Sequence, residues 1–297
     1  MSTDIQHFEI VDPHVHLWDL SHHGAWYPSL TGKPRAGEDG GLGDTSGLRR
    51  DYLLPQYEAD AQNYRVSKLV HVTATQASGS YRDETRWLEG MKAECGRPHA
   101  LIAAIDPGLS LPEISRELDA LQACDSLRGI RVVFGLDPGA SATRELLRML
   151  SERGLIFELV AHPHNALEFA RLLEKLPDLR VVLEHMGWPT APNEAGHFVQ
   201  WQTGMRALAG LGTVACKLSG LAMALHEISE ARMRPWIEAA IEDFGIDRCC
   251  FASNFPVDGL YGSFNDLYTV YRSISAGLGA AAERQLFVTN AERIYLI

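Results

Sequence analysis

The stretch "VDPHVHLWD" (residues 11–19) lies near the start of the chain and guides the interpretation of the rest. Side chains two residues apart on a strand point to one face, so Asp12, His14 and His16 are expected to lie together. Two adjacent imidazoles inside a protein need polar partners or a cation, because leaving them unpaired costs a few kcal/mol each. An H-x-H pair on a strand also offers one metal ion two nitrogen ligands. The segment therefore predicts one wall of a buried polar site.

Seven further apolar runs follow, and a helix-like stretch separates each from the next. Near-continuous apolar runs are typical of parallel strands that are covered on both faces. Polar residues near their ends recur at intervals of 25 to 37 residues, which leaves room for a strand, a loop and a helix. The expected strands are 8–17, 67–74, 99–107, 127–134, 154–162, 179–187, 212–220 and 248–256.

This alternation predicts an α/β protein with a single (β/α)8 barrel domain over residues 1–297. Helices are expected over 83–95, 111–124, 143–153, 165–175, 197–209, 230–244 and 265–277. A doubly wound open sheet is the competing fold, and it is disfavoured because no G-x-G-x-x-G follows the first strand.

Residues 19–50 interrupt the alternation of strands and helices, since they are rich in Gly, Ser and Pro and show no periodicity. A loop of this length inside a compact domain is often a lid. It follows the first strand, so in a barrel it would hang over the catalytic mouth, where Trp26 and Tyr27 could close on a substrate. A surface loop packed by its own aromatic residues is the alternative.

Composition excludes several classes of function. The net charge is −11 and no run of Lys and Arg occurs, so nucleic acid is not an expected partner. No apolar run reaches the ~18 residues that a membrane span requires. The five cysteines form no C-x-x-C pair and no signal peptide is evident, which indicates a cytoplasmic protein. The partner is then a small-molecule substrate, and an oligomer is neither predicted nor excluded.

Polar residues lie at the ends of successive expected strands, a placement that is difficult to explain by packing. In a barrel these ends meet at one mouth, so the residues are expected to form one converging site. They are His71, Arg131, Glu158, His162, His185, Lys217 and Asn254.

Several motifs, in order and spacing, resemble the lactonase-like branch of the amidohydrolase superfamily. They are "DPHVHLWD", "LRRDYLLPQYEADA", "LVHVTA", "ETRWL", "LRGIR", "VVLEHMGWP", "CKLSGL" and "FASNFPVD", and they span nearly the whole chain. The resemblance implies a (β/α)8 barrel and, most often, hydrolysis of a lactone of a sugar acid or of a pyrone dicarboxylate. Relatives in the wider superfamily include decarboxylases and hydratases.

The resemblance also implies roles for individual positions. His14 and His16 match the H-x-H of the first strand, and His185 matches the histidine that follows the sixth strand. Arg131 matches an arginine that faces a substrate carboxylate. The motif of the eighth strand normally carries an Asp that activates water, and here that position is Asn254.

This departure matters because an amide has no useful basicity near neutral pH. Asn254 is still expected to orient a water molecule or a substrate hydroxyl. The base then has to come from another residue, and the candidates are His185, Asp258, Asp12 and His71.

A divalent metal ion, zinc, would be held by His14, His16 and His185. Without the strand-eight Asp such a site loses an anionic ligand and much of its affinity. We expect the ion to be weakly bound or dispensable, because histidine can deprotonate water while cationic and N–H groups stabilise the oxyanion.

The sequence thus predicts a cytoplasmic lactonase of carbohydrate catabolism, a hydrolase of carboxylic ester bonds. Its catalytic residues would be His14, His16, His185 and Asn254, and its substrate-binding residues His71, Arg131, Lys217, Trp26 and Asp258. A metal-dependent decarboxylase or hydratase on the same barrel is the first alternative. A non-catalytic ligand-binding protein, suggested by Asn254, is the second.

Overall fold

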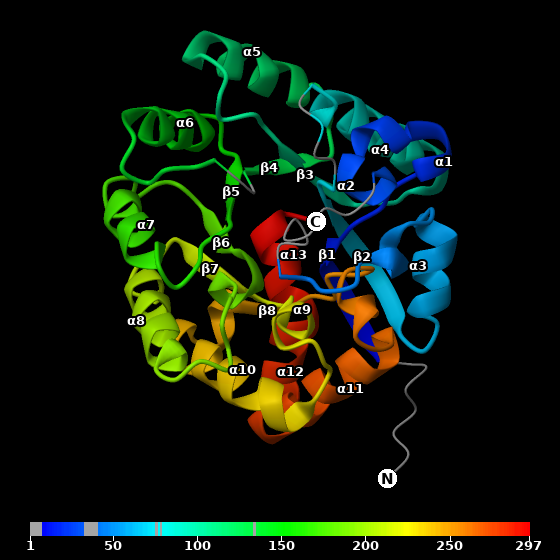
Figure 1. Cartoon of the computed structure of the whole chain (residues 1–297), viewed down its shortest axis with the longest axis vertical. Helices are drawn as coiled ribbons and strands as arrows, with labels where there is room; N and C mark the ends of the chain where they lie inside the picture. The colour runs from blue at the N-terminus through cyan, green and yellow to red at the C-terminus, as the bar shows by residue number, and fades with distance from the viewer. Residues whose placement is uncertain (1–7, 33–40, 75–76, 78, 133–134) are drawn as a thin grey trace.

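The computed structural model describes residues 8–32, 41–74, 77, 79–132 and 135–297. Eight parallel strands follow one another in chain order around a barrel, as predicted (Figure 1). The strands are β1 (Glu9–Val15), β2 (Arg65–Val72), β3 (Ala100–Ala104), β4 (Leu127–Arg131), β5 (Ile156–Leu159), β6 (Val181–Leu183), β7 (Val214–Leu218) and β8 (Cys249–Phe251).

Helices surround the barrel, and Figure 1 looks into the mouth formed by the carboxyl ends of the strands. The helices between and after the strands are α3 (Leu54–Asp60), α4 (Tyr81–Cys95), α5 (Leu111–Leu121), α6 (Ser141–Glu152), α7 (Ala166–Leu173), α8 (His197–Ala209), α9 (Leu221–Leu225), α10 (Glu230–Phe244), α11 (Phe264–Ser275), α12 (Ala280–Arg284) and α13 (Asn290–Tyr295).

The helix α5 shows why these segments are helical. Ser110 and Glu113 form a capping box at its start, which satisfies backbone donors that the first turn leaves open. Ile114, Leu118 and Leu121 follow at helical spacing, and all three are buried against the barrel. Local signals of this kind explain why seven helices lie close to their predicted ranges.

The segment expected to be one long loop contains short helices where the structure describes it. They include α1 (Leu20–His23) and α2 (Pro28–Thr31). Farther along, the backbone carbonyl groups of Gly41 and Leu42 accept hydrogen bonds from His226 and Tyr261, which follow α9 and β8. The segment therefore contacts the neighbouring loops that follow β7 and β8. Its role as a lid remains a prediction.

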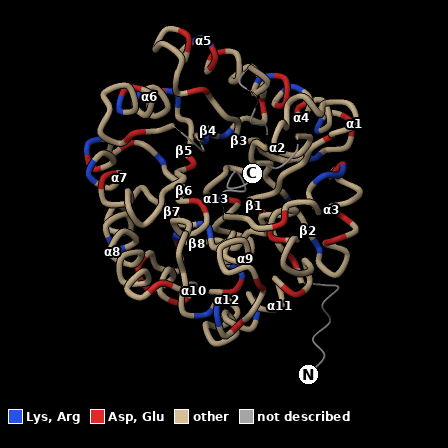
Figure 2. The backbone as a smooth tube through the Cα atoms, in the orientation of Figure 1, with Lys and Arg blue, Asp and Glu red and all other residues tan. Residues whose placement is uncertain are grey.

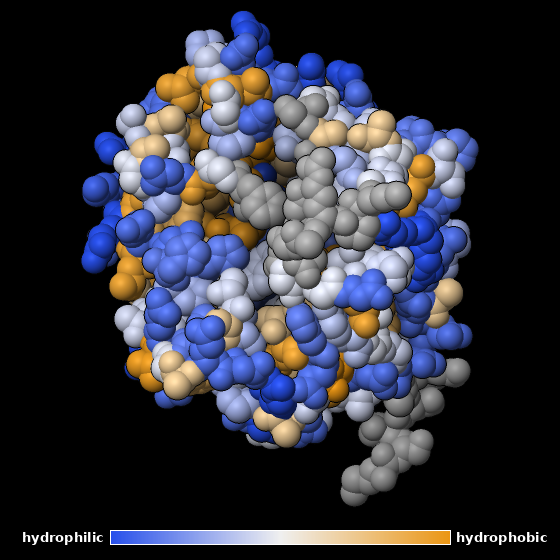
Figure 3. Space-filling view, viewed as in Figure 1, coloured by the Kyte–Doolittle hydropathy of each residue, from blue (hydrophilic) through white to orange (hydrophobic). Residues whose placement is uncertain are grey.

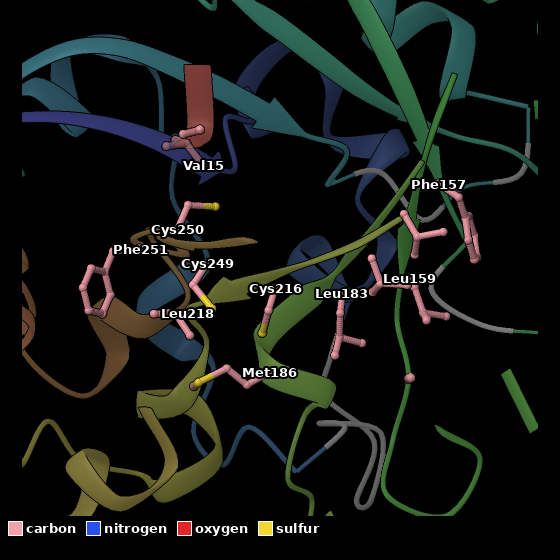
Figure 4. Packing of buried hydrophobic residues seen from close by; sticks show 14 of the residues in the cluster. Val15, Phe157, Leu159, Leu183, Met186, Cys216, Leu218, Cys249, Cys250 and Phe251 are labelled. Atoms are coloured by element: carbon pink, nitrogen blue, oxygen red, sulfur yellow. The ribbon is translucent and has the colours of Figure 1, made fainter. Parts of the chain in front are cut away.

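The core has two layers. Residues such as Phe157, Leu159 and Leu183 lie between the strands and the outer helices (Figure 4). Within the barrel a smaller cluster of strand residues packs around Tyr295 of α13: Val70, Val72, Ala100, Ile102, Ile156 and Val182. Asn290 of α13 donates to the carbonyls of Ile246 and Cys249 at the amino end of β8, so α13 closes the end of the barrel opposite the mouth. Figure 1 shows α13 at the centre of the barrel.

The barrel closes where β1 meets the chain after β8, and we call this junction the seam. Val15 bridges to Phe255 in parallel, and the backbone N–H of His16 donates to the Phe255 carbonyl over 2.9 Å. The backbone N–H of Asn254 donates to the His14 carbonyl, also over 2.9 Å. The predicted H-x-H pair therefore lies on the strand that closes the barrel.

Asp12 does not share the face of the two histidines, which corrects the expectation from simple alternation. The register between β1 and β2 shifts between Asp12 and Val15, so the strand loses its two-residue period there. The Asp12 carboxylate instead accepts hydrogen bonds from the Tyr57 hydroxyl and the Ser253 backbone N–H, both over 2.9 Å. It stabilises the seam and is not a candidate base.

The surface carries both signs of charge. Lys and Arg alternate with Asp and Glu around the outer helices (Figure 2). The mouth face is hollowed beside α6 and α7, and apolar residues are visible inside the hollow (Figure 3). Among the described residues, no helix combines the length and the apolar character that crossing a membrane requires.

Replacing Asp12 with Ala should lower the free energy of unfolding by roughly 2–4 kcal/mol, because it leaves a buried backbone N–H of Ser253 without an acceptor. Urea denaturation measures the change. Asp119, which forms an exposed ion pair with Arg153, is the control, and Asp119→Ala should cost less than about 1 kcal/mol. Equal losses in the two variants would contradict the role of Asp12 in the seam.

Candidate functional site

Two buried imidazoles of β1 form the first wall of the site. The Nε2 atoms of His14 and His16 lie 3.1 Å apart, and the rings meet edge to face. His16 Nδ1 lies 2.8 Å from the carbonyl of Val72, so this nitrogen carries a proton and donates. Because a neutral imidazole has one N–H, the Nε2 of His16 is the acceptor in this contact.

A buried ion pair lies beneath His14. The ammonium of Lys217 on β7 is 3.1 Å from His14 Nδ1, and it also donates to the Pro13 carbonyl over 3.2 Å. Its counter-charge is Glu158 on β5, at 2.9 Å, and both side chains are fully buried. Lys217, expected to bind substrate, is therefore engaged by the protein itself.

The turn after β6 presents two consecutive residues to the site. Glu184 and His185 both lie in the short 3-10 helix Glu184–Gly187, and both are buried. His185, Met186 and Trp188 have φ values of 51°, 51° and 30°, a left-handed backbone that is unusual outside glycine. Such strain persists where surrounding contacts fix it and is frequent at functional sites.

Close contacts hold His185 in place. Its ring centroid lies 4.6 Å from that of His14, and its Nδ1 is 3.0 Å from the Ser219 hydroxyl. Gly220, with φ of 67°, packs against the ring so closely that a Cβ there would lie 2.4 Å from Nδ1. The other nitrogen, Nε2, is 3.9 Å from Glu184.

Arg131 at the end of β4 is paired on the same side of the site. One guanidinium nitrogen donates to Glu184 over 3.1 Å, and the other donates to the Thr73 carbonyl over 2.7 Å. Arg131 therefore lies at the mouth, as expected, and the carboxylate of Glu184 neutralises its charge.

Asn254 and Asp258 form a pair beside the seam. The Asn254 amide N–H group donates to Asp258 over 2.9 Å and makes a weaker contact with the sulfur of Met223. Asp258 is fully buried, and its carboxylate also accepts from the Met223 backbone N–H at the start of α9. Asp258 is therefore buried beneath the site, and its hydrogen bond fixes the orientation of the Asn254 amide.

Two of the other expected residues, His71 and Trp26, have different neighbours. His71 lies between Val70 and Val72, whose side chains belong to the cluster inside the barrel, and its Nε2 contacts the Leu17 carbonyl at 3.3 Å. The Trp26 ring stacks on His23 with centroids 4.0 Å apart. The structure therefore joins His14, His16, His185 and Lys217 directly and links Arg131 to them through Glu184. It leaves His71 and Trp26 outside these contacts.

Burial sets the protonation states of the cluster. It lowers the pKa of His185 to about 3, although the charge of Glu184 acts in the opposite direction. Burial, and then the charge of Lys217, holds the pKa of His14 well below its usual range. Burial also lowers the pKa of His16 strongly. The three imidazoles are neutral at pH 7.

The carboxyl groups of the site differ in the direction in which their pKa values are shifted. Burial alone would raise the pKa of Glu184, but Arg131 and Lys217 outweigh it and lower that pKa. Burial raises the pKa of Glu158, and the charge of Lys217, its partner in a tight buried pair, acts against that rise. Burial also raises the pKa of Asp258 to about 7, against the hydrogen bond from Asn254. Glu184 is therefore the ionised carboxylate of the mouth.

The donor set fits a divalent cation. His14, Glu184 and His185 each offer one ligand atom, and these atoms lie within 4.8 Å of one another. Neutral imidazoles and an ionised carboxylate are the forms in which such residues bind metals. The charges of Arg131 and Lys217 nearby oppose a further cation, which favours weak binding.

Sequence reasoning overlooked Glu184 and left Glu158 without a role. Glu184 adjoins His185 in "VVLEHMGWP", and only the histidine of this pair was predicted to belong to the site. Its inward direction follows from β6, because Val182, two residues earlier, lies inside the barrel. The periodicity of the strand was the signal that could have identified it.

Sequence similarity to known proteins covers almost the whole chain. A profile of the amidohydrolase family matches residues 11–297. An uncharacterized protein of Sinorhizobium fredii is 33% identical over 97% of this chain and 98% of its own length. The L-fucono-1,5-lactonase of Burkholderia ambifaria is 25% identical over 97% of this chain and 95% of its own.

Solved structures share the fold. A crystal structure of an amidohydrolase from Burkholderia multivorans with bound zinc superposes with a TM-score of 0.81. The two sequences are 21% identical, and the match covers 97% of this chain and 99% of the other. At this identity the likeness establishes the barrel fold and says nothing about whether this chain binds zinc.

Gly220→Ala should destabilise the protein by more than about 2 kcal/mol, because the new methyl group meets the ring of His185. Gly154 is a matched control, since it has a φ of 68° but nothing within 4 Å of an added Cβ. Gly154→Ala should cost only about 1 kcal/mol of backbone strain. Thermal unfolding measures both, and similar losses would show that the contact with His185 is unimportant.

Asp258→Asn should change the pH dependence of stability. The pKa of Asp258 is about 7 in the folded chain and about 3.9 when unfolded. The native protein therefore loses stability as pH rises from about 4 to about 7, by up to roughly 4 kcal/mol from this group. The asparagine variant lacks this loss, so its stability relative to the native protein should increase over that range. A constant difference in urea titrations from pH 4 to 8 would refute the assignment.

Proposed function

Because the chain belongs to the amidohydrolase family, we propose that it hydrolyses the lactone of a sugar acid at the mouth of its barrel. The observation that carries the proposal is the cluster of three neutral, buried imidazoles, His14, His16 and His185, beside the paired Arg131 and Glu184. Neutral imidazoles can both accept a proton from water and donate N–H groups to an oxyanion.

In the proposed reaction water adds to the lactone carbonyl and the ring opens to a hydroxy acid. His185 takes the proton from water at Nε2, because Ser219 engages its Nδ1. Glu184, 3.9 Å from that nitrogen, stabilises the imidazolium that forms. When the bond between the carbonyl carbon and the ring oxygen breaks, the imidazolium returns its proton to that oxygen, which becomes the hydroxyl group of the product. The imidazole of His14 and the guanidinium of Arg131 stabilise the oxyanion.

A bound divalent ion would be held by His14, Glu184 and His185 and would polarise the carbonyl as a Lewis acid. The steps given for the side chains do not require it. We therefore expect hydrolysis to persist at a reduced rate after chelation.

Asn254 is proposed to orient water or a substrate hydroxyl. Its N–H group faces Asp258 and Met223, so the carbonyl oxygen of the amide is the atom directed elsewhere. A carbonyl oxygen accepts a hydrogen bond but does not remove a proton at neutral pH. Asn254 would thus assist His185 without acting as the base.

The charges favour an uncharged sugar lactone over a pyrone dicarboxylate. Glu184 neutralises Arg131, and Glu158 neutralises Lys217. A dicarboxylate would enter a site in which the two cations beside the histidines already have anionic partners, so its desolvation would be poorly compensated. The name of the Burkholderia ambifaria relative, a fuconolactonase, agrees with this preference.

The proposal is tested with a pH-stat screen of aldonolactones and pyrone carboxylates, with and without chelator. We expect hydrolysis of aldonolactones, and His185→Asn should lower kcat by about 100-fold or more. His99, a half-buried histidine at the start of β3, is the matched control, and His99→Asn should keep near-native kcat.

Three results would favour other functions. Full lactonase activity in His14→Asn or His185→Asn would refute the proposal. Stoichiometric zinc without any lactone hydrolysis would support a decarboxylase or hydratase. A native protein inactive on all lactones that gains activity through Asn254→Asp would indicate a binding protein.

A further inference from the structure

A column of buried polar groups runs from the closed end of the barrel to His14. The Tyr295 hydroxyl of α13 donates to Glu158, Glu158 pairs with Lys217, and Lys217 reaches His14 Nδ1. All four side chains are fully buried. The residues come from α13, β5, β7 and β1, so the column connects the C-terminal helix to the proposed catalytic cluster.

The direction of these hydrogen bonds determines where His14 carries its proton. An ammonium group can only donate, so Lys217 requires Nδ1 of His14 to be the acceptor. A neutral imidazole has a single ring proton, which must then reside on Nε2. That N–H donates to Nε2 of His16, whose own Nδ1–H donates to the Val72 carbonyl. A single set of proton positions therefore satisfies every hydrogen bond in the series from Lys217 to Val72.

We propose that Lys217, held by Glu158 and Tyr295, is a positioning residue that fixes His14 as an Nε2–H donor. Its catalytic meaning rests on the proposed lactone hydrolysis, where this N–H would turn from His16 to the oxyanion and stabilise it. The tautomer itself is a property of the protein and can be measured without a substrate.

Tyr295 and Glu158 are needed because a buried ammonium is stable only with a counter-charge in good geometry. The Tyr295 hydroxyl satisfies one oxygen of Glu158 and leaves the other directed at Lys217. The Tyr295 ring also lies 5.4 Å from the Lys217 ammonium, a distance at which the ring face attracts a cation. These contacts hold the amino group of Lys217 in position beside His14.

The arrangement has a consequence for metal binding. A nitrogen that carries a proton cannot ligate a metal, so a cation and the Nε2 proton compete for the same atom of His14. Lys217 therefore weakens binding of a cation at the cluster of His14, Glu184 and His185. Removing its charge should strengthen that binding.

Nitrogen-15 NMR of ring-labelled histidine tests the tautomer directly. The His14 signals are identified as those lost in His14→Gln. In the native protein we expect Nδ1 without a proton and Nε2 with one. In Lys217→Met the proton should be distributed over both nitrogens. An unchanged His14 tautomer in Lys217→Met would overturn the proposal.

The double variant Glu158→Gln/Lys217→Met guards against loss of folding, because it removes both buried charges together. It should show the same change in tautomer. By calorimetry both variants should bind zinc about 10-fold more tightly than the native protein. Unchanged or weaker zinc binding in both would refute the competition between proton and cation.

Tyr295→Phe tests the far end of the column. It should lower kcat about 3–10-fold with little change in KM, the effect of losing one buried hydrogen bond. Tyr268 is the matched control, since it is fully buried and its hydroxyl has no hydrogen-bond partner within the described part of the chain. Tyr268→Phe should leave kcat unchanged, and equal losses in the two variants would contradict a specific role for Tyr295.

The measurements separate this inference from the proposed function. A native protein that hydrolyses no lactone, but whose His14 tautomer responds to Lys217→Met, would refute the lactonase and leave the positioning role intact. A lactonase whose tautomer does not respond would retain its function and lose the positioning role.

Discussion

The seam between β1 and β8 is the constraint on which the site depends. An open sheet would leave the edges of its first and last strands unpaired, and closure of the barrel removes both edges. Here the closing hydrogen bonds involve the backbone of His14, His16 and Asn254. The Asp12 carboxylate supports the same junction from outside the barrel. The backbone that closes the barrel thus also fixes the position of the predicted catalytic side chains.

Charge compensation explains how so many polar groups are tolerated in the interior. Two ion pairs, Arg131 with Glu184 and Lys217 with Glu158, flank imidazoles that burial keeps neutral. An isolated buried charge would be expensive, whereas a pair with further hydrogen bonds retains both charges. The interior can therefore contain donors and acceptors at fixed positions without a large net charge. Such preorganised polarity is what stabilises a developing oxyanion.

The fold and part of the site could be predicted from sequence for a physical reason. Strand burial and helix amphipathicity are local, so the eight strands and seven outer helices were identified near their observed bounds. Asp12 was misplaced because an irregularity in pairing changes which way a side chain points. Glu184 was missed, and the burial of Asp258 beneath Asn254 was not predicted, because burial and partners depend on contacts between distant segments. Tyr295 had no local signal, since its role arises only from the way α13 enters the barrel.

The span of these contacts along the chain affects how the protein must fold. Tyr295 and Glu158 are 137 residues apart, Lys217 and Pro13 are 204 apart, and Ser253 and Asp12 are 241 apart. Contacts of such separation form slowly, because the entropy of closing long loops is lost before they stabilise the chain. A nascent chain has its histidine pair from the first strand but lacks the groups that orient it. Competence for chemistry should therefore appear abruptly, only after the last helix has been synthesised and has entered the barrel.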